Sequence, residues 1–289
     1  MNPFRVRVPA SASNIGAGFD CLGLALDLWL ELDVTEGSGT IRYSGALESI
    51  DPAQDIIRTT LDNAGVLSNI AVTVVSEIPL GRGLGSSAAA TVAALVAGAR
   101  AGSEPRGRDQ VFEGAVELEG HPDNAAPATF GGLILVAEHP TPLTFHESLS
   151  VALAIPETSI ETKIARSALP DDYDRHVAVE QARRAAALAT GLTNGRGDFI
   201  RFGMEDQLAV PYRKDLIPGF QDAVDAGKKA GAYGVTISGS GSTLIAIGPR
   251  RTANDAAEAM SEALTAHANA ASPLTPKVVE TGYTVTDIK

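Results

Sequence analysis

A glycine-rich loop at residues 78–90 is the part of the sequence whose residue types point most clearly to chemistry. It reads IPLGRGLGSSAAA, so Gly81, Gly83 and Gly85 come just before two serines and a helix predicted over 86–101. Glycines allow positive φ angles and close backbone approach, and a helix start offers unpaired N–H groups and a positive dipole end. Such a loop is typical of phosphate binding.

The loop differs from two widespread nucleotide-binding motifs. A Walker A loop, G-x-x-x-x-G-K-[ST], cannot be placed on it, and its third glycine comes too early for a Rossmann fingerprint. A tight turn that only joins a strand to a helix is the alternative explanation. The alternating glycines followed by Ser86 and Ser87 favour phosphate binding, because hydroxyls can contact phosphate or a metal-bound water.

Three segments, in order along the chain, resemble motifs of the GHMP small-molecule kinases. The segment 79–89 is similar to the family's phosphate loop, 6–26 to its N-terminal substrate motif, and 234–247 to its glycine-rich third motif. The resemblance implies an ATP site made by the whole first segment, namely Pro79, Leu80, Gly81, Arg82, Gly83, Leu84, Gly85, Ser86, Ser87, Ala88 and Ala89.

The substrate motif is most similar to that of family members that phosphorylate the amino alcohol homoserine. Asn14 and Asp20 match its Asn and Asp, which implies that Asp20 binds the substrate ammonium and that Asn14 lies near the reacting hydroxyl. A turn cap is the structural alternative for Asp20. Thr162 and Arg166, four apart on a predicted helix, and Arg213 resemble segments whose arginines bind the substrate carboxylate. For a single arginine, a surface ion pair is the alternative.

The segment 119–132 also matches the family and implies a magnesium site. Glu119 and Ser86 are the expected ligands, because Mg²⁺ takes a few hard oxygen donors and completes its shell with water and phosphate. Glu113 and Glu117 on the same predicted helix are alternatives to Glu119.

Asn124 stands where many GHMP kinases have an aspartate that takes the proton of the attacking hydroxyl. An amide cannot do this, so the resemblance implies catalysis by positioning and Mg²⁺ charge stabilisation, with Asn14, Asn124 and Arg166 as the catalytic set and Asn124 also contacting substrate. His121 and Asp123 form either an acid/base pair or the turn beneath the phosphate loop, and we favour the turn.

The resemblance thus implies ATP-dependent phosphorylation of the side-chain hydroxyl of L-homoserine to O-phospho-L-homoserine, a step of threonine biosynthesis. Two alternatives stay open: a kinase of this family that acts on another small alcohol, of the mevalonate or shikimate type, and a nucleotide-binding sensor without turnover. The family also implies a homodimer.

Composition narrows the class of protein. The chain has 289 residues and a net charge of −12, which argues against a nucleic-acid surface. Cys21 is the single cysteine, so an intramolecular disulfide is excluded and a reducing compartment is expected. Neither a signal-peptide core nor an apolar stretch of about 18 residues is present, so we expect a cytoplasmic protein with no membrane partner.

Hydrophobic periodicity predicts an α+β fold in two lobes, at 1–145 and 146–289, with the Pro-rich stretch 138–148 as linker. The family resemblance implies a ribosomal-S5-like first lobe, which binds ATP, and a ferredoxin-like second lobe, which completes the substrate site. Strands are expected at 4–8, 24–36, 41–45, 70–78, 131–138, 151–155, 233–238, 242–247 and 276–282. Helices are expected at 52–66, 86–101, 108–119, 161–168, 174–190, 219–230 and 252–268, with an irregular region up to 218.

Overall fold

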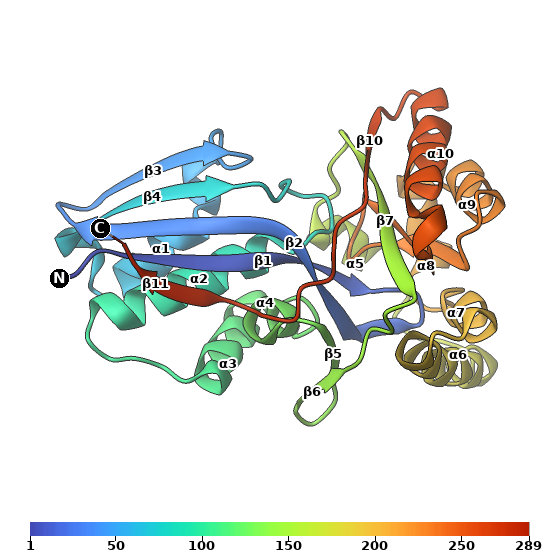
Figure 1. Ribbon diagram of the computed structural model, residues 1–289, viewed down its shortest axis with the longest axis horizontal. Helices are drawn as coiled ribbons and strands as arrows, with labels where there is room; N and C mark the ends of the chain where they lie inside the picture. The colour runs from blue at the N-terminus through green and yellow to red at the C-terminus, as the bar shows by residue number, and fades with distance from the viewer. Residues whose placement is uncertain (289) are drawn as a thin grey trace.

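Two β-sheets organise the protein into two lobes, described over residues 1–288 by a computed structural model (Figure 1). The first sheet has the order β11-β1-β2-β4-β3, and β5 joins it through β2 and pairs in turn with β6. The second sheet has the order β10-β7-β9-β8. The strands are β1 Phe4–Asn14, β2 Gly18–Glu36, β3 Thr40–Gly45, β4 Ile70–Ser76, β5 Leu133–Val136, β6 Pro140–Leu143, β7 Leu149–Pro156, β8 Gly234–Ile237, β9 Leu244–Pro249, β10 Ala271–Leu274 and β11 Thr284–Asp287. This confirms the two-lobed α+β architecture.

Helices pack against both sheets (Figure 1). In the first lobe α2 and α4 pack against β1 and β2, and α1 and α3 flank α2. In the second lobe α9 and α10 pack together against its sheet. The helices are α1 Ile56–Asn63, α2 Ser86–Ala101, α3 Arg108–Glu119, α4 Ala125–Phe130, α5 Thr162–Ser167, α6 Arg175–Asn194, α7 Gly197–Gly203, α8 Val210–Arg213, α9 Phe220–Lys229 and α10 Ala253–Ala266, with short 3-10 turns at Pro52–Gln54, Leu67–Asn69, Lys214–Leu216 and Arg250–Thr252. No helix within residues 1–288 has the length and apolar character needed to cross a bilayer.

The long antiparallel pair β1 and β2 is the backbone of the first lobe. The period-2 pattern predicted a strand at 4–8, and β1 continues to Asn14. Its last residues are buried on both faces, which removes the alternation that sequence reasoning relies on. Strand β2 begins at Gly18, six residues before the predicted start, and its partly buried residues Phe19, Asp20 and Cys21 show no apolar alternation.

Strand β7 contributes to two hydrophobic cores. Val151 and Leu153 belong to the core that is shared with the first lobe, whereas Ala152 and Ala154 belong to the core under α9 and α10. Successive side chains of a strand point to opposite faces, so burial on both faces gives a continuous apolar run. This arrangement fixes the second sheet against the first lobe.

The C-terminal part of the chain departs most from the sequence-based expectation. The predicted strand at 276–282 is wrong: β10 and β11 lie on either side of it, and within it Val278 forms an isolated bridge to Leu26. Because β11 pairs with β1, β11 belongs to the first sheet (Figure 1).

Two regions that were expected to lack regular structure contain short elements. The predicted linker at 138–148 contains β6, and the region before 218 contains α7 and α8. The lobe boundary between residues 145 and 146 stays a prediction.

Candidate active site

A cavity of about 820 Å³ lies where the lobes meet. Four segments that are far apart in sequence form much of its wall: the phosphate loop (residues 79–85), the β1–β2 turn (residues 14–20), the start of α5 and the turn at residues 239–240. Small-molecule sites typically have volumes of roughly 300–1,000 Å³. The cavity is therefore large enough for a small substrate beside a nucleotide.

The phosphate loop has the backbone that its glycines predicted. Gly81, Gly83 and Gly85 have φ angles of +62°, +71° and +68°, and α2 begins at the next residue. A Cβ atom on Gly83 or Gly85 would collide with its neighbours, so close approach and conformation both require glycine. Of the residues predicted to bind ATP, positions 79 to 88 line the cavity, whereas Ala89 is fully buried in the core.

The Arg82 side chain ties the phosphate loop to the second lobe. Its Nε donates to the carbonyl oxygen of Pro156 at 2.7 Å, its Nη1 donates to Leu80 at 3.1 Å, and its Nη2 donates to the carbonyl oxygen of Glu157. Partial burial lowers the pKa of Arg82, and the nearby Glu157 charge opposes this shift. The guanidinium is thus engaged by main-chain carbonyls.

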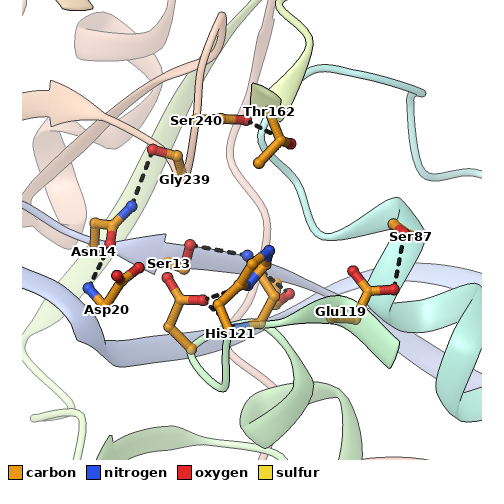
Figure 2. A network of polar contacts seen from close by, with 12 residues as sticks. Ser13, Asn14, Asp20, Ser87, Glu119, His121, Thr162, Gly239 and Ser240 are labelled. Carbon is orange, nitrogen blue, oxygen red and sulfur yellow. Dashed lines mark hydrogen bonds and ion pairs between the residues drawn. The ribbon is translucent and has the colours of Figure 1, made fainter. Parts of the chain in front are cut away.

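Two oxygen groups beside the loop fit a hard divalent cation. The hydroxyl of Ser86 is buried and finds no hydrogen-bond partner among residues 1–288. Glu119 Oε1 accepts hydrogen bonds from Ser87 Oγ at 2.8 Å and Thr91 Oγ1 at 2.6 Å, which hold the carboxylate at the cavity wall (Figure 2). Within residues 1–288 no cluster of three His, Cys, Asp or Glu side chains forms a closed metal site. One hydroxyl and one carboxylate suit Mg²⁺, which completes its shell with phosphate and water.

The β1–β2 turn is held in a rare backbone conformation. Asn14, Ile15 and Asp20 have positive φ angles of 69°, 51° and 54°. Asn14 accepts a hydrogen bond from the Asp20 amide N–H at 2.9 Å and donates to the carbonyl oxygen of Gly239 at 3.0 Å (Figure 2). Strained backbone of this kind persists where surrounding contacts enforce it and clusters at functional sites. Asn14 therefore fixes Asp20 against the third motif.

The cavity brings together charged side chains from both lobes. Arg166 Nη2 lies 2.9 Å from Asp20 Oδ1, and Nη1 lies 3.4 Å from Oδ2. On the same helix, Thr162 Oγ1 lies 3.5 Å from Ser240 Oγ (Figure 2). Helix α5 thus contacts both the substrate motif and the third motif.

Arg213 is a buried cation on the same wall, with a relative exposure of 4%. Its Nε donates to Ala165 at 2.9 Å, and Nη1 lies 3.3 Å from the Gly239 carbonyl oxygen. Burial and then the Arg166 charge lower the pKa of Arg213, while Asp20 and Asp206 raise it. Among residues 1–288 it has no carboxylate within 4.0 Å. Its charge is therefore available to an anionic group of a ligand.

Asn124 is held by two serines of β1. Ser11 Oγ donates to its Oδ1 at 2.8 Å, and its Nδ2 donates to Ser13 Oγ at 3.0 Å. These bonds fix the orientation of the amide, with its oxygen facing Ser11 and its nitrogen facing Ser13. An amide in this setting orients neighbouring groups and does not act as a base.

His121, labelled in Figure 2, lines the cavity, as does Asn124. Its Nδ1 is 3.0 Å from Asp123 Oδ1, and the same oxygen accepts the amide N–H of Asn124 at 3.0 Å. The hydrogen bond to Asp123 raises the pKa of His121, and burial opposes this shift. The pair thus adds a protonatable group to the wall.

The wall also carries apolar side chains outside the phosphate loop. Leu47, Ile50, Ile56 and Leu118 line the cavity together with the polar side chains of Ser49, Asp51 and Gln54. Apolar side chains of this kind suit the flat face of a nucleotide base.

Comparison with known proteins connects this geometry to a family. Residues 52–132 match GHMP kinases N terminal domain, and residues 178–266 match GHMP kinases C terminal. The chain belongs to the GHMP kinase family. A homoserine kinase from Picosynechococcus sp. is 38% identical, covering 91% of this chain and 92% of that protein. A homoserine kinase from Deinococcus radiodurans is 36% identical, covering 86% and 85%.

Solved structures of GHMP kinases agree with the fold. A homoserine kinase from Cytophaga hutchinsonii has a TM-score of 0.86 at 28% identity, covering 99% of this chain and 98% of that one. A mevalonate kinase from L. major has a TM-score of 0.70 at 16% identity, with 96% of each chain covered. At that identity only the fold is shared.

In this GHMP kinase the predicted site residues come together around one cavity. Those on its wall, apart from the phosphate loop, are Asn14, Asp20, Glu119, Asn124, Thr162, Arg166 and Arg213. The alternatives Glu113 and Glu117 are not among the lining residues. Which of these groups touch substrate stays a prediction.

Sequence reasoning missed part of the polar network. It treated His121 and Asp123 as a turn, although the imidazole lines the cavity. It assigned no role to Ser11 and Ser13, which fix Asn124. The alternate spacing of these serines on a strand that also carries Asn14 was the available signal, because residues two apart share a face.

Proposed function

We propose that this chain is a homoserine kinase, which transfers the γ-phosphoryl group of ATP to the side-chain hydroxyl of L-homoserine and forms O-phospho-L-homoserine for threonine biosynthesis. The observation that carries the proposal is the pairing of Asp20 with Arg166 at 2.9 Å in the cavity that the phosphate loop lines. A free amino acid carries an ammonium and a carboxylate, which complement these two groups. The homoserine kinases at 36% and 38% identity support the assignment.

Each substrate group has a proposed partner in the cavity. Asp20 binds the ammonium, and Arg166 and Arg213 bind the carboxylate, because a guanidinium can meet a carboxylate through two hydrogen bonds. Thr162 adds a hydroxyl next to Arg166. Asn14 keeps Asp20 in place through its backbone contact.

Phosphoryl transfer in this site depends on positioning and charge neutralisation. The glycine loop and the start of α2 offer N–H groups to the ATP phosphates. Ser86 and Glu119 would hold Mg²⁺, which supplies positive charge at the phosphates. Asn124, oriented by its serine partners, lines the site of the reacting hydroxyl without removing its proton. The proton then leaves to a γ-phosphate oxygen or to water, which a loose transition state permits.

The proposed cellular setting is the cytoplasm, and the proposed assembly is a homodimer. The single cysteine supports a reducing compartment. The dimer rests on the family resemblance alone and is tested by sedimentation of the purified protein.

The decisive experiment is a coupled assay of ADP formation by the purified protein. We expect turnover with homoserine and Mg²⁺, and none with mevalonate, shikimate or galactose, or after metal removal by EDTA. Turnover with another alcohol alone would overturn the substrate and leave the kinase class intact. An absence of turnover with every alcohol, combined with ATP binding, would favour a nucleotide sensor.

A further inference from the structure

Asp206 is a buried carboxylate that the proposed reaction does not use. It lies between α7 and α8 with a relative exposure of 5%. Its Oδ2 accepts the amide N–H groups of Ala209 at 2.6 Å and Val210 at 2.7 Å, and its Oδ1 accepts that of Leu208 at 3.2 Å. A carboxylate with so many donors is held rigidly.

These contacts fix the helix that carries Arg213. Helix α8 is a single turn, with the groups bound by Asp206 at its start and Arg213 as its last residue. So short a helix has little stability of its own. Asp206 therefore determines where the guanidinium of Arg213 lies.

Asp206 also supplies a counter-charge for Arg213, whose guanidinium donates to the carbonyl oxygens of Ala165 and Gly239. Both side chains border a small cavity, which is also lined by Asn14 and Thr236, and no ion pair joins them within the described residues 1–288. A buried cation is costly without a nearby negative charge. The oxygens of Asp206 accept hydrogen bonds from main-chain N–H groups. The Asp206 charge therefore stabilises Arg213 without occupying the N–H groups of the guanidinium.

Gln181 extends this contact to the other end of the substrate site. Located on α6 with a relative exposure of 7%, it donates through Nε2 to Asp206 Oδ1 at 2.7 Å and to the carbonyl oxygen of Ala17 at 3.2 Å. Its Oε1 accepts the amide N–H of Gln207 at 2.9 Å. Ala17 belongs to the β1–β2 turn that carries Asp20, and α6 lies beside that hairpin (Figure 1).

We propose that Asp206 and Gln181 are positioning residues that set the distance between Asp20 and Arg213, and so match the site to the ammonium and carboxylate of a small amino acid. The inference rests on the proposed function. It adds two residues that lie outside the three motifs at 6–26, 79–89 and 234–247. The residues that would determine how the cavity fits an amino acid then include Gln181 on α6 and Asp206 just before α8. The nucleotide end does not depend on them.

The test compares Gln181→Leu and Asp206→Asn with a control, Gln221→Ala. Gln221 is exposed, and its side chain donates a hydrogen bond to Asp225. Steady-state kinetics are measured for both substrates, and melting temperatures establish that each variant is folded. We expect the KM for homoserine to rise about tenfold in both variants, while the KM for ATP stays within about twofold of wild type. The control is expected to match wild type.

Three outcomes separate the possibilities. An unchanged homoserine KM in a folded variant, or an equal rise of both KM values, would overturn the positioning role. If neither variant folds, Gln181→Asn keeps an uncharged amide on a side chain that is one methylene shorter, so it cannot bond Asp206, Ala17 and Gln207 together, and the same rise in homoserine KM is expected. Absence of homoserine turnover in the wild type overturns the proposed function itself, and this inference with it.

Discussion

Arg166 and Asp20 form an ion pair across the two lobes, with Nη2 and Oδ1 separated by 2.9 Å. Asp20 belongs to β2 and Arg166 to α5, so the pair joins the substrate motif of the first lobe to the helix that borders the third motif. A bound zwitterion supplies an ammonium for the carboxylate and a carboxylate for the guanidinium. When a zwitterion binds, the Asp20–Arg166 pair is replaced by two pairs, Asp20 with the ammonium and Arg166 with the carboxylate, so every charge has a partner. A ligand with a single charge leaves either Asp20 or Arg166 without one.

This relationship predicts how Asp20→Asn changes selectivity. The variant keeps the shape of the side chain and loses the charge that binds the ammonium. We expect kcat/KM for homoserine to fall about tenfold to a hundredfold, because a hydrogen bond to a charged group contributes roughly 1.5–3 kcal/mol. Activity with 4-hydroxybutyrate, which lacks the ammonium, is expected to fall less. Asp198→Asn at an exposed ion pair is the control, and an equal loss with both alcohols would contradict the role of Asp20.

Arg213→Lys tests whether the planar fork is needed. Lysine keeps the charge but cannot bond Ala165 and Gly239 while also meeting a carboxylate through two bonds. We expect the KM for homoserine to rise at least about tenfold, with a smaller change in the KM for ATP. The matched control is Arg196→Lys at an exposed pair with Asp198. A wild-type KM for homoserine would show that charge alone suffices.

Arg82→Lys tests the link between the phosphate loop and the second lobe. The segment that accepts its hydrogen bonds, at Pro156 and Glu157, leads directly into α5. Lysine cannot reproduce the three-way contact, so we expect both KM values, for ATP and for homoserine, to rise about fivefold, as the loss of about 1 kcal/mol implies. Arg183→Lys, at an exposed pair with Glu180, serves as the control. A rise in the KM for ATP alone would mean that Arg82 affects only the phosphate loop and does not position the second lobe.

Local sequence patterns predicted the parts of the site that depend on backbone chemistry. The glycine spacing predicted the phosphate loop, and the strands expected at 233–238 and 242–247 in the third motif are present as β8 and β9, which pair with each other. Both features depend on few neighbouring residues, and glycine permits the positive φ angles that Gly81, Gly83 and Gly85 adopt. The start of α2 at Ser86 was also predicted correctly, since it too follows from neighbouring residues.

Contacts between distant segments could not be read from the sequence. Asp206 and Gln181 gain their role only because α6 lies beside the β1–β2 turn, and sequence periodicity says nothing about that packing. The pairing of β11 with β1 is of the same kind, since it joins residues from opposite ends of the chain. His121 was read as part of a turn because only tertiary structure shows that its ring faces the cavity.

The His121–Asp123 contact predicts a pH-dependent contribution to stability. The hydrogen bond to Asp123 raises the pKa of His121 above its unfolded value of about 6.5, and burial opposes this shift. The charges of Asp123 and Glu119 also raise the pKa, whereas the charge of Arg166 lowers it. A group whose pKa is raised on folding stabilises the protein fully below its unfolded pKa and loses that contribution as pH rises through the folded pKa. His121→Gln should therefore reduce the free energy of unfolding more at about pH 5 than at about pH 9.

The measurement is chemical denaturation of wild type and variant at both pH values, with His139→Gln as control. The His139 side chain is exposed and has no hydrogen bond within residues 1–288, so its replacement should lower stability equally little at both pH values. A His121→Gln effect that stays constant with pH would mean that folding leaves the pKa of His121 unchanged, which would contradict the expected stabilisation of the charged imidazole by Asp123. A larger effect at low pH would show that the contact with Asp123 favours the charged imidazole on the cavity wall.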